Sequence, residues 1–108
     1  QEKYDEARKL LKESLQIRWG LGDKHGAADN IAYLAKVVLC CNQPDQAVIL
    51  AQVAARAFQQ MKTPPVRIDL KEIILAARNL LDEASYAAAT AIGEVQDMAE
   101  LVNELLRQ

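Results

Sequence analysis

The chain has 108 residues, which suits one domain, and its hydrophobic fraction of 51% is sufficient for a buried core. Aromatic residues make up only 5%, and much of the apolar fraction is alanine, which favours closely packed helices and argues against a β-sandwich. The net charge of −2 is uneven, because residues 82–108 contain six acidic residues and one basic residue. Without a dense basic stripe, we expect no direct binding of nucleic acid.

The sequence also excludes a hydrophobic transmembrane segment, since it has no apolar run of about 18 residues. It has no signal-peptide pattern at its start, so we expect a cytoplasmic protein without membrane contact. The only cysteines are the adjacent Cys40 and Cys41, which point about 100° apart on a helix and rarely bridge. We expect both to be buried or half-buried small side chains near a helix C-terminus.

Apolar residues recur at helical spacing along the chain and predict an all-α fold with about six helices. The first three predicted helices span 3–21, 27–41 and 45–61. Gly22 and Asn42 tolerate positive φ and therefore end the first two, while Asp23 can begin the second. The third ends where Thr63, Pro64 and Pro65 break the helical pattern.

The last third of the chain predicts three further helices, at 66–81, 83–92 and 97–106. The fifth is rich in alanine and is expected to end at Gly93. Asp97 with Glu100 three residues later has the form of a capping box, so Asp97 is expected to begin the last helix. No segment shows a convincing period of two, and no strand is predicted.

The chain contains an internal sequence repeat. Tyr4-Asp5-Glu6-Ala7 and Pro44-Asp45-Gln46-Ala47 stand 40 residues apart, and Leu10 matches Leu50 at the same offset. A period of this size in helix–turn–helix units is typical of a solenoid of helical hairpins. Because the turns are short, we expect antiparallel contacts of helix 27–41 with both of its neighbours.

Small residues stand where such helices would cross, namely Ala35, Ala47 and Ala54, and Asn42 takes the place of the glycine between the helices. On these residues, segment 27–61 resembles one complete tetratricopeptide repeat. Segment 3–21 resembles the second helix of a truncated preceding repeat, with Ala7 and Ser14 at its small positions. Segment 66–108 then corresponds to a degenerate terminal repeat and cap, and residues 1–108 to a single domain of this type.

The run from Leu81 to Ala89, with Gly93 and the segment from Asp97 to Val102, is similar to the closing part of repeat arrays in large bacterial signalling ATPases and transcriptional activators. The resemblance implies a non-catalytic domain that receives a signal and binds protein, as the C-terminal part of a larger bacterial regulator. A free-standing helical adaptor or oligomerisation module is the alternative, and a small-molecule sensor is a further one.

The sequence contains few residues that could act in catalysis or bind a metal or phosphate. His25 is the only histidine, and we expect it in a solvated turn beside Gly26, without the converging ligands of a zinc site. No phosphate-binding loop is present, and paired acids such as Asp69 and Glu72 are explained by helix starts. We therefore expect no catalytic residue, no metal and no cofactor.

In the tetratricopeptide family the first helix of a repeat lines a partner groove. By position, the resemblance places six residues there: Asp29, Ala32, Tyr33, Lys36, Leu39 and Cys40. Arg67, Lys71 and Arg78 lie at i, i+4 and i+11 and could form a basic patch, although a solvated helix face explains the same spacing.

Segment 3–21 is apolar on more than one side. Tyr4 and Leu11 belong to one side, and Leu10, Ile17 and Leu21 to another, while helix 27–41 can cover only one of them. Burying one such side chain contributes about 1.5–3 kcal/mol, so an uncovered side favours association. We expect the isolated chain to self-associate through these residues as a symmetric homodimer.

Overall fold

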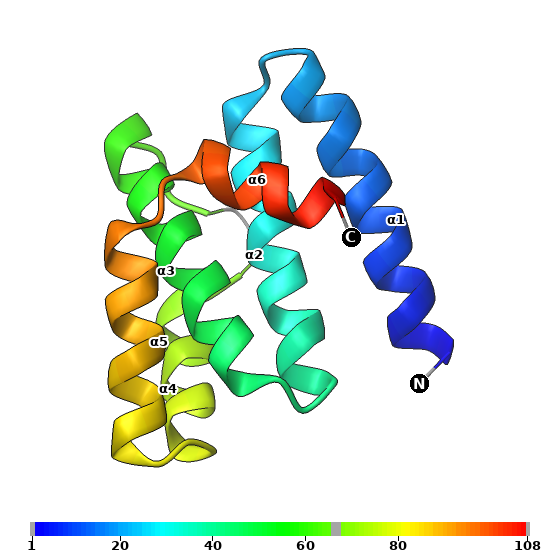
Figure 1. Cartoon of the computed structure of the whole chain (residues 1–108). Helices are drawn as coiled ribbons and strands as arrows, with labels where there is room; N and C mark the ends of the chain where they lie inside the picture. The colour runs from blue at the N-terminus through cyan, green and yellow to red at the C-terminus, as the bar shows by residue number, and fades with distance from the viewer. Residues whose placement is uncertain (1, 66–67, 108) are drawn as a thin grey trace.

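Six helices and no strand make up the part of the chain that the computed structural model describes, residues 2–65 and 68–107 (Figure 1). The helices are α1 (Glu2–Gly20), α2 (Lys24–Cys40), α3 (Pro44–Met61), α4 (Leu70–Asn79), α5 (Glu83–Val95) and α6 (Met98–Arg107). The predicted all-α fold with six helices is confirmed. Among these residues, no helix combines the length and the hydropathy that crossing a bilayer requires.

Aspartate caps begin four of the helices. Each carboxylate accepts a hydrogen bond from the backbone N–H three residues later and so satisfies a donor at the helix start. The pairs are Asp23 with Gly26 at 2.9 Å, Asp69 with Glu72 at 3.2 Å, Asp82 with Ser85 at 2.7 Å, and Asp97 with Glu100 at 2.8 Å. The hydrogen bond from Ser85 lowers the pKa of Asp82. The Asp97 N–H donates back to Glu100 at 3.5 Å, which confirms the predicted capping box.

The turns after the first three helices each use one residue with left-handed backbone. Gly22 has φ of 77°, Asn42 has 63° and Lys62 has 57°. Glycine and asparagine adopt this conformation at low cost, as the sequence predicted for the first two turns. Lysine is an unusual residue for this conformation. The left-handed residue at the end of α3, directly before Thr63, was not predicted from the sequence.

The first three helices pack as antiparallel neighbours, α1 on α2 and α2 on α3, as predicted (Figure 1). Alanine is frequent among the buried residues of α2 and α3, and small side chains let packed helices approach closely. Eight alanines of these two helices are buried: Ala27, Ala28, Ala32, Ala35, Ala47, Ala51, Ala54 and Ala57. Leu15 of α1 and Leu34, Leu50 and Val53 fill the spaces between them and are almost fully buried.

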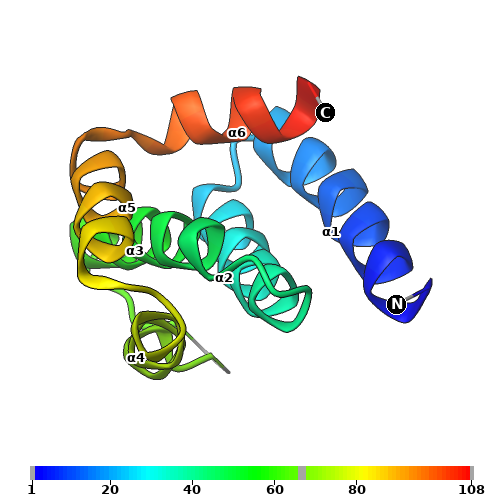
Figure 2. The same cartoon turned by 60° about the horizontal axis from the view of Figure 1, so that its bottom comes forward.

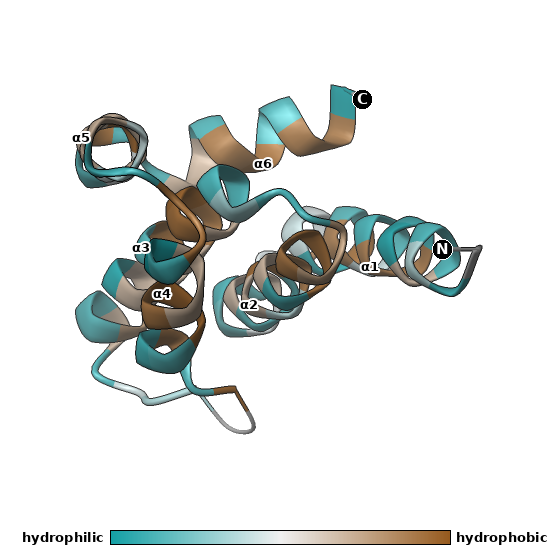
Figure 3. Cartoon of the chain, turned by 90° about the horizontal axis from the view of Figure 1, so that it is seen from below, coloured by the Kyte–Doolittle hydropathy of each residue, from teal (hydrophilic) through white to brown (hydrophobic). Residues whose placement is uncertain are grey.

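The remaining helices use both faces of this three-helix layer. Figure 2 shows α4 and α6 on opposite sides of α2 and α3. The helices α4 and α5 both pack on α3, and α6 runs back to contact α1 as well as α3. The hydrophobic side of α6 faces the body of the protein in Figure 3, where Leu101, Val102 and Leu105 are buried. The C-terminal helix thus crosses the array instead of extending it.

The fourth helix is shorter than predicted. It begins at Leu70 rather than at residue 66, and it ends at Asn79. Ile68 and Asp69 lie outside the helix, because the Asp69 side chain caps it and its backbone is extended. The predicted start at residue 66 lies outside the described residues.

The fifth helix is longer than predicted, since it passes through Gly93 and ends at Val95. Gly93 is buried against α3, and a Cβ atom there would lie 2.1 Å from Oε1 and 3.2 Å from Cβ of Gln52. The glycine therefore serves the close approach of two helices rather than a helix end. A glycine read from sequence alone gives no way to separate these two roles.

Arg56 of α3 holds the C-terminal end of α5. Its Nη1 donates to the Gly93 carbonyl at 2.8 Å and to the Glu94 carbonyl at 3.2 Å, and its Nη2 donates to the Gln96 carbonyl. The last carbonyls of a helix lack partners within the helix and carry partial negative charge. One guanidinium therefore satisfies several of them and fixes the turn from α5 to α6.

A buried polar network joins α1 to α2 around Asn30, which is only 4% exposed. Its Nδ2 donates to the Leu11 carbonyl at 3.0 Å, and its Oδ1 accepts from Arg18 Nη1 at 2.9 Å. Arg18 Nη1 also donates to the Gly26 carbonyl at 3.1 Å. A Cβ atom on Gly26 would lie 2.7 Å from Arg18 Cδ, so glycine leaves room for this side chain.

We predict that Asn30→Leu destabilises the protein by about 1–3 kcal/mol, because it removes the partner of two buried polar groups while keeping a similar volume. Urea unfolding followed by circular dichroism measures the change. Asn103→Leu on the exposed side of α6 is the matched control and should change stability by about 0.5 kcal/mol or less. Equal unfolding midpoints for the two variants would contradict a role for the network.

We further predict that Arg56→Met frees the turn between α5 and α6 and makes it several-fold more sensitive to a glutamate-specific protease acting after Glu94. Arg56→Lys should be intermediate, since an ammonium keeps the charge but lacks the planar fork of donors. The cleavage rate in native buffer is the readout, with Arg107→Met as the control. Unchanged cleavage in Arg56→Met would show that the guanidinium does not hold this turn.

Candidate functional site

A groove with a volume of about 330 Å³ lies between the C-terminal half of α2 and the start of α4. Its apolar lining consists of Leu39, Ile68, Ile73 and Ala76, and its polar lining of Lys36, Cys40, Asp69 and Glu72. Leu39 and Cys40 follow Lys36 by three and four residues, so all three share one face of α2. The groove thus combines an apolar floor with charged groups, as binding sites commonly do.

The structure brings together half of the residues that the resemblance placed in a partner groove. Lys36, Leu39 and Cys40 line the groove, whereas Asp29 and Tyr33 are half-buried on α2 outside its lining. The assignment of Ala32 is wrong, because this side chain is fully buried in the core. Ala32 lies on the edge of α2 that packs inward.

The opposite wall comes from α4 and was missed by the sequence analysis. Ile73 and Ala76 project from α4, and Ile68 comes from the extended residues before it. The spacing of Asp69 and Glu72 marks the start of a helix, but it does not show that this start lies beside α2.

The charges of the groove are divided between its two walls. Lys36 stands on α2 and is exposed, and Asp69 and Glu72 stand at the N-terminal end of α4. Among the described residues, Lys36 has no hydrogen-bond or ion-pair partner. Asp69 uses one carboxylate oxygen to cap α4, and its other oxygen remains able to accept a hydrogen bond.

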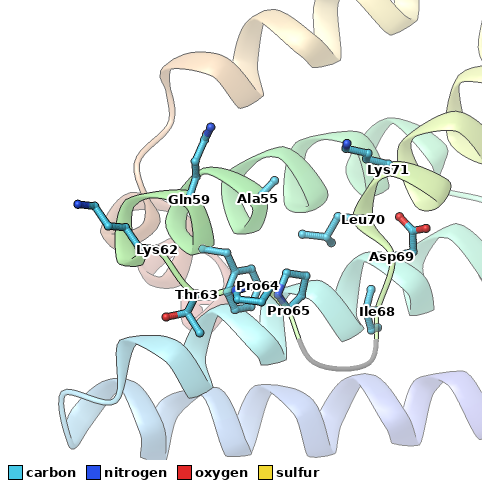
Figure 4. Close-up of a pocket in the computed structure, with 11 residues that line it drawn as sticks. Ala55, Gln59, Lys62, Thr63, Pro64, Pro65, Ile68, Asp69, Leu70 and Lys71 are labelled. Atoms are coloured by element: carbon cyan, nitrogen blue, oxygen red, sulfur yellow. The ribbon is translucent and has the colours of Figure 1, made fainter.

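A wider hollow of about 940 Å³ adjoins the groove, and Ile68 and Asp69 line both (Figure 4). It lies between the C-terminal half of α3 and the segment that leads to α4. Pro64, Pro65 and Leu70 contribute apolar surface, while Lys62 and Gln59 extend away from it in Figure 4. The candidate site is the smaller groove, and all of its lining residues are among those that the structure describes.

The two cysteines differ in their surroundings. Cys41 is half-buried, as expected, but Cys40 is exposed, which corrects the expectation for this side chain. It is the last residue of α2 and lies at the rim of the groove. The hydrogen bond between Cys40 and Tyr4 raises the pKa of the Tyr4 hydroxyl, and electrostatic repulsion from the Cys40 side chain adds to this effect.

The expected location of His25 in a solvated turn is wrong. His25 belongs to the first turn of α2, is half-buried, and packs edge-on against Phe58 with ring centroids 5.3 Å apart. The Asp23 cap starts α2 earlier than the apolar pattern indicated. In residues 2–65 and 68–107, no group of three or more His, Cys, Asp or Glu side chains has an arrangement that could hold a metal ion.

The proposed basic patch is only partly described. Arg67 lies outside the described residues. Lys71 is exposed and lines the wider hollow. Arg78 lies over the ring of Tyr86, with Cζ 5.0 Å from the ring centroid, a cation–π arrangement.

The residues expected to self-associate separate into two groups on α1. Leu10, Ile17 and Leu21 are exposed, with 57%, 63% and 79% of their surface accessible, although Leu21 lies just beyond the helix end. Tyr4 is 39% exposed, and Leu11 is half-buried against the core. Leu11 therefore contributes to packing within the chain. Leu10, Ile17 and Leu21 form an uncovered stripe, which we call the α1 stripe.

No protein-family model matches this chain, and no significant match was found among curated proteins or solved structures.

Proposed function

We propose that this chain is a non-catalytic, protein-binding helical domain whose partner segment binds in the groove between α2 and α4. The observation that carries the proposal is the meeting of Lys36, Leu39 and Cys40 with a wall of α4 residues around one groove. An apolar floor with a cation on one wall and two carboxylates on the other can fix the position and direction of a peptide.

The charges define the chemistry of the partner. A segment with one or two large apolar residues would fill the space over Leu39 and Ile73, since the groove is too small for a whole peptide. An acidic residue on one side of them would meet Lys36, and a basic residue on the other side would meet Asp69 and Glu72. Such complementary charges contribute more to specificity than to affinity.

The wider setting of the domain follows from the tetratricopeptide resemblance and is part of the same proposal. The antiparallel succession of α1, α2 and α3, with alanines at their contacts, supports a repeat of helical hairpins. On this basis the chain acts as the C-terminal, signal-receiving part of a larger bacterial regulator in the cytoplasm. Catalysis, metal and cofactor are assigned to no residue of this chain.

A second candidate function is oligomerisation, which the α1 stripe favours. Leu10 and Ile17 are large apolar residues on one exposed side of α1, and the exposed Leu21 follows just beyond the end of this helix. Exposed apolar residues gathered in this way mark interaction surfaces more often than isolated ones do. We propose that the isolated chain self-associates through this stripe, with a second copy of the chain as the partner.

The groove is tested by selecting displayed random peptides on the wild-type chain and measuring their affinity by fluorescence anisotropy. We predict that the selected peptides carry an apolar residue flanked by opposite charges. Leu39→Glu and Lys36→Glu should each weaken their binding by tenfold or more, because the first places charge in the apolar floor and the second removes the cation.

Lys9→Glu is the matched control, since Lys9 is an exposed lysine on α1, away from the groove. It should leave the affinity within twofold. If Lys9→Glu abolished binding while Lys36→Glu and Leu39→Glu left it unchanged, the groove would not be the binding site.

A further inference from the structure

A cavity of about 220 Å³ lies where α1, α2, α3 and α6 meet, separate from the groove. The groove borders α4, whereas this cavity borders α6, and these two helices lie on opposite sides of the three-helix layer (Figure 2). Its apolar lining comes from α2, α3 and α6, and its polar lining from α1 and the start of α3. The lining residues are Leu34, Val38, Leu50 and Leu105, together with Arg8, Lys12, Gln43 and Gln46.

Arg8 brings a guanidinium to this cavity without a carboxylate partner. Its Nη2 donates to Gln43 Oε1 at 3.0 Å, the one hydrogen bond that this side chain makes among the described residues. Its Nε is covered by protein atoms and has no acceptor there. A charged donor that leaves water without an acceptor is costly, and guanidinium bonds to carboxylates are among the stronger hydrogen bonds in proteins. Arg8 is therefore half-buried with most of its donors able to bind an anion.

Lys12 adds a second positive charge to the same cavity. It follows Arg8 by four residues, so the two side chains share one face of α1. Partial burial and the charge of Arg8 lower the pKa of Lys12. An ammonium group has three donors and can bind more than one acceptor. No acidic residue lines the cavity. Asp5 and Glu13 line an adjoining hollow, and neither forms an ion pair with Arg8.

The start of α3 contributes further positive potential. Its N-cap residue, Gln43, makes no capping hydrogen bond with its side chain, which instead accepts from Arg8. The first N–H groups of a helix lack partners within the helix and carry partial positive charge. Gln43 and Gln46 line the cavity, whereas the exposed Asp45 of the same turn does not. The helix start and the two cations of α1 thus border one cavity.

We propose that this cavity binds a small organic anion, a carboxylate with a short aliphatic chain. The carboxylate accepts hydrogen bonds from Arg8 and Gln46, and the aliphatic chain packs on Leu50 and Leu105. The cavity volume equals the share of about seven water molecules in the liquid, which suits a ligand with a similar number of heavy atoms. The apolar lining favours such a ligand over free phosphate, because phosphate oxygens would meet it without donors. The site lies on the opposite face from the groove, so the inference does not rest on peptide binding.

Titration of the chain with pentanoate, followed in two-dimensional amide NMR spectra, is the test. We expect saturable shifts of the backbone amides of Gln43 and Gln46 and of the Arg8 Nε–H signal. Acetate should bind at least fivefold more weakly, because it lacks the aliphatic chain. The alcohol 1-pentanol should also bind at least fivefold more weakly, because it lacks the charge.

Arg8→Met should weaken pentanoate binding by tenfold or more, because it removes the guanidinium and keeps an apolar side chain. Lys9→Met is the matched control: it removes one positive charge from the same helix, but Lys9 does not line the cavity. It should leave the affinity within twofold. If circular dichroism shows that Arg8→Met loses helical content, Gln46→Glu replaces it. A carboxylate in the first turn suits the start of α3, and it should repel the ligand and cause the same loss of affinity.

Four results overturn the proposal. Pentanoate may not cause saturable shifts, or its shifts may leave Gln43 and Gln46 unmoved, and in either case the cavity is not its site. Equal losses of affinity in Arg8→Met and Lys9→Met would show an effect of overall charge only. Inorganic phosphate that binds as tightly as pentanoate would show that the apolar lining does not contribute. None of these results bears on the groove, since peptide binding there should be unchanged in Arg8→Met.

Discussion

The close contact between α2 and α3 is the constraint on which the other helices depend. These two helices contain eight buried alanines, which allow close packing, and α3 also contacts α4, α5 and α6. A larger side chain at one of these positions would push the helices apart, at a cost of typically about 1–3 kcal/mol. It would also shift the helices that rest on α3. Polar contacts then fix the outer helices on this pair: Asn30 and Arg18 join α1 to α2, and Arg56 holds the end of α5.

The surfaces proposed to bind other proteins follow from this arrangement. Because α4 packs on α3 and reaches α2, its first residues face Lys36 and Leu39 across the groove. Because α2 covers only one side of α1, the side of α1 that bears Leu10 and Ile17 remains uncovered. Binding surfaces of this kind are flanks of packed helices and need no special backbone conformation.

Much of this architecture could be predicted from the sequence, because the dominant signals are local. Apolar spacing located the helices, and Gly22, Asn42 and Asp97 marked three of their limits. The failures concern residues whose role depends on another helix. Gly93 looks like a helix end until Gln52 is placed beside it, and His25 looks solvated until Phe58 packs against it. In the groove, the sequence indicated Lys36 and Leu39 but not Ile73, because nothing local shows which helix lies opposite α2.

Native-state hydrogen exchange tests most directly whether α2 and α3 form the core on which the other helices depend. Amides in well-packed elements exchange only through the largest openings, whereas weakly held elements open separately and sooner. The measurement is made at low micromolar concentration, so that self-association does not protect α1. The account predicts that the slowest amides lie in the middle of α2 and α3, around Ala35 and Ala51, and that α6 exchanges earlier. Slowest exchange in α1 or α6, with α3 opening before them, would contradict it.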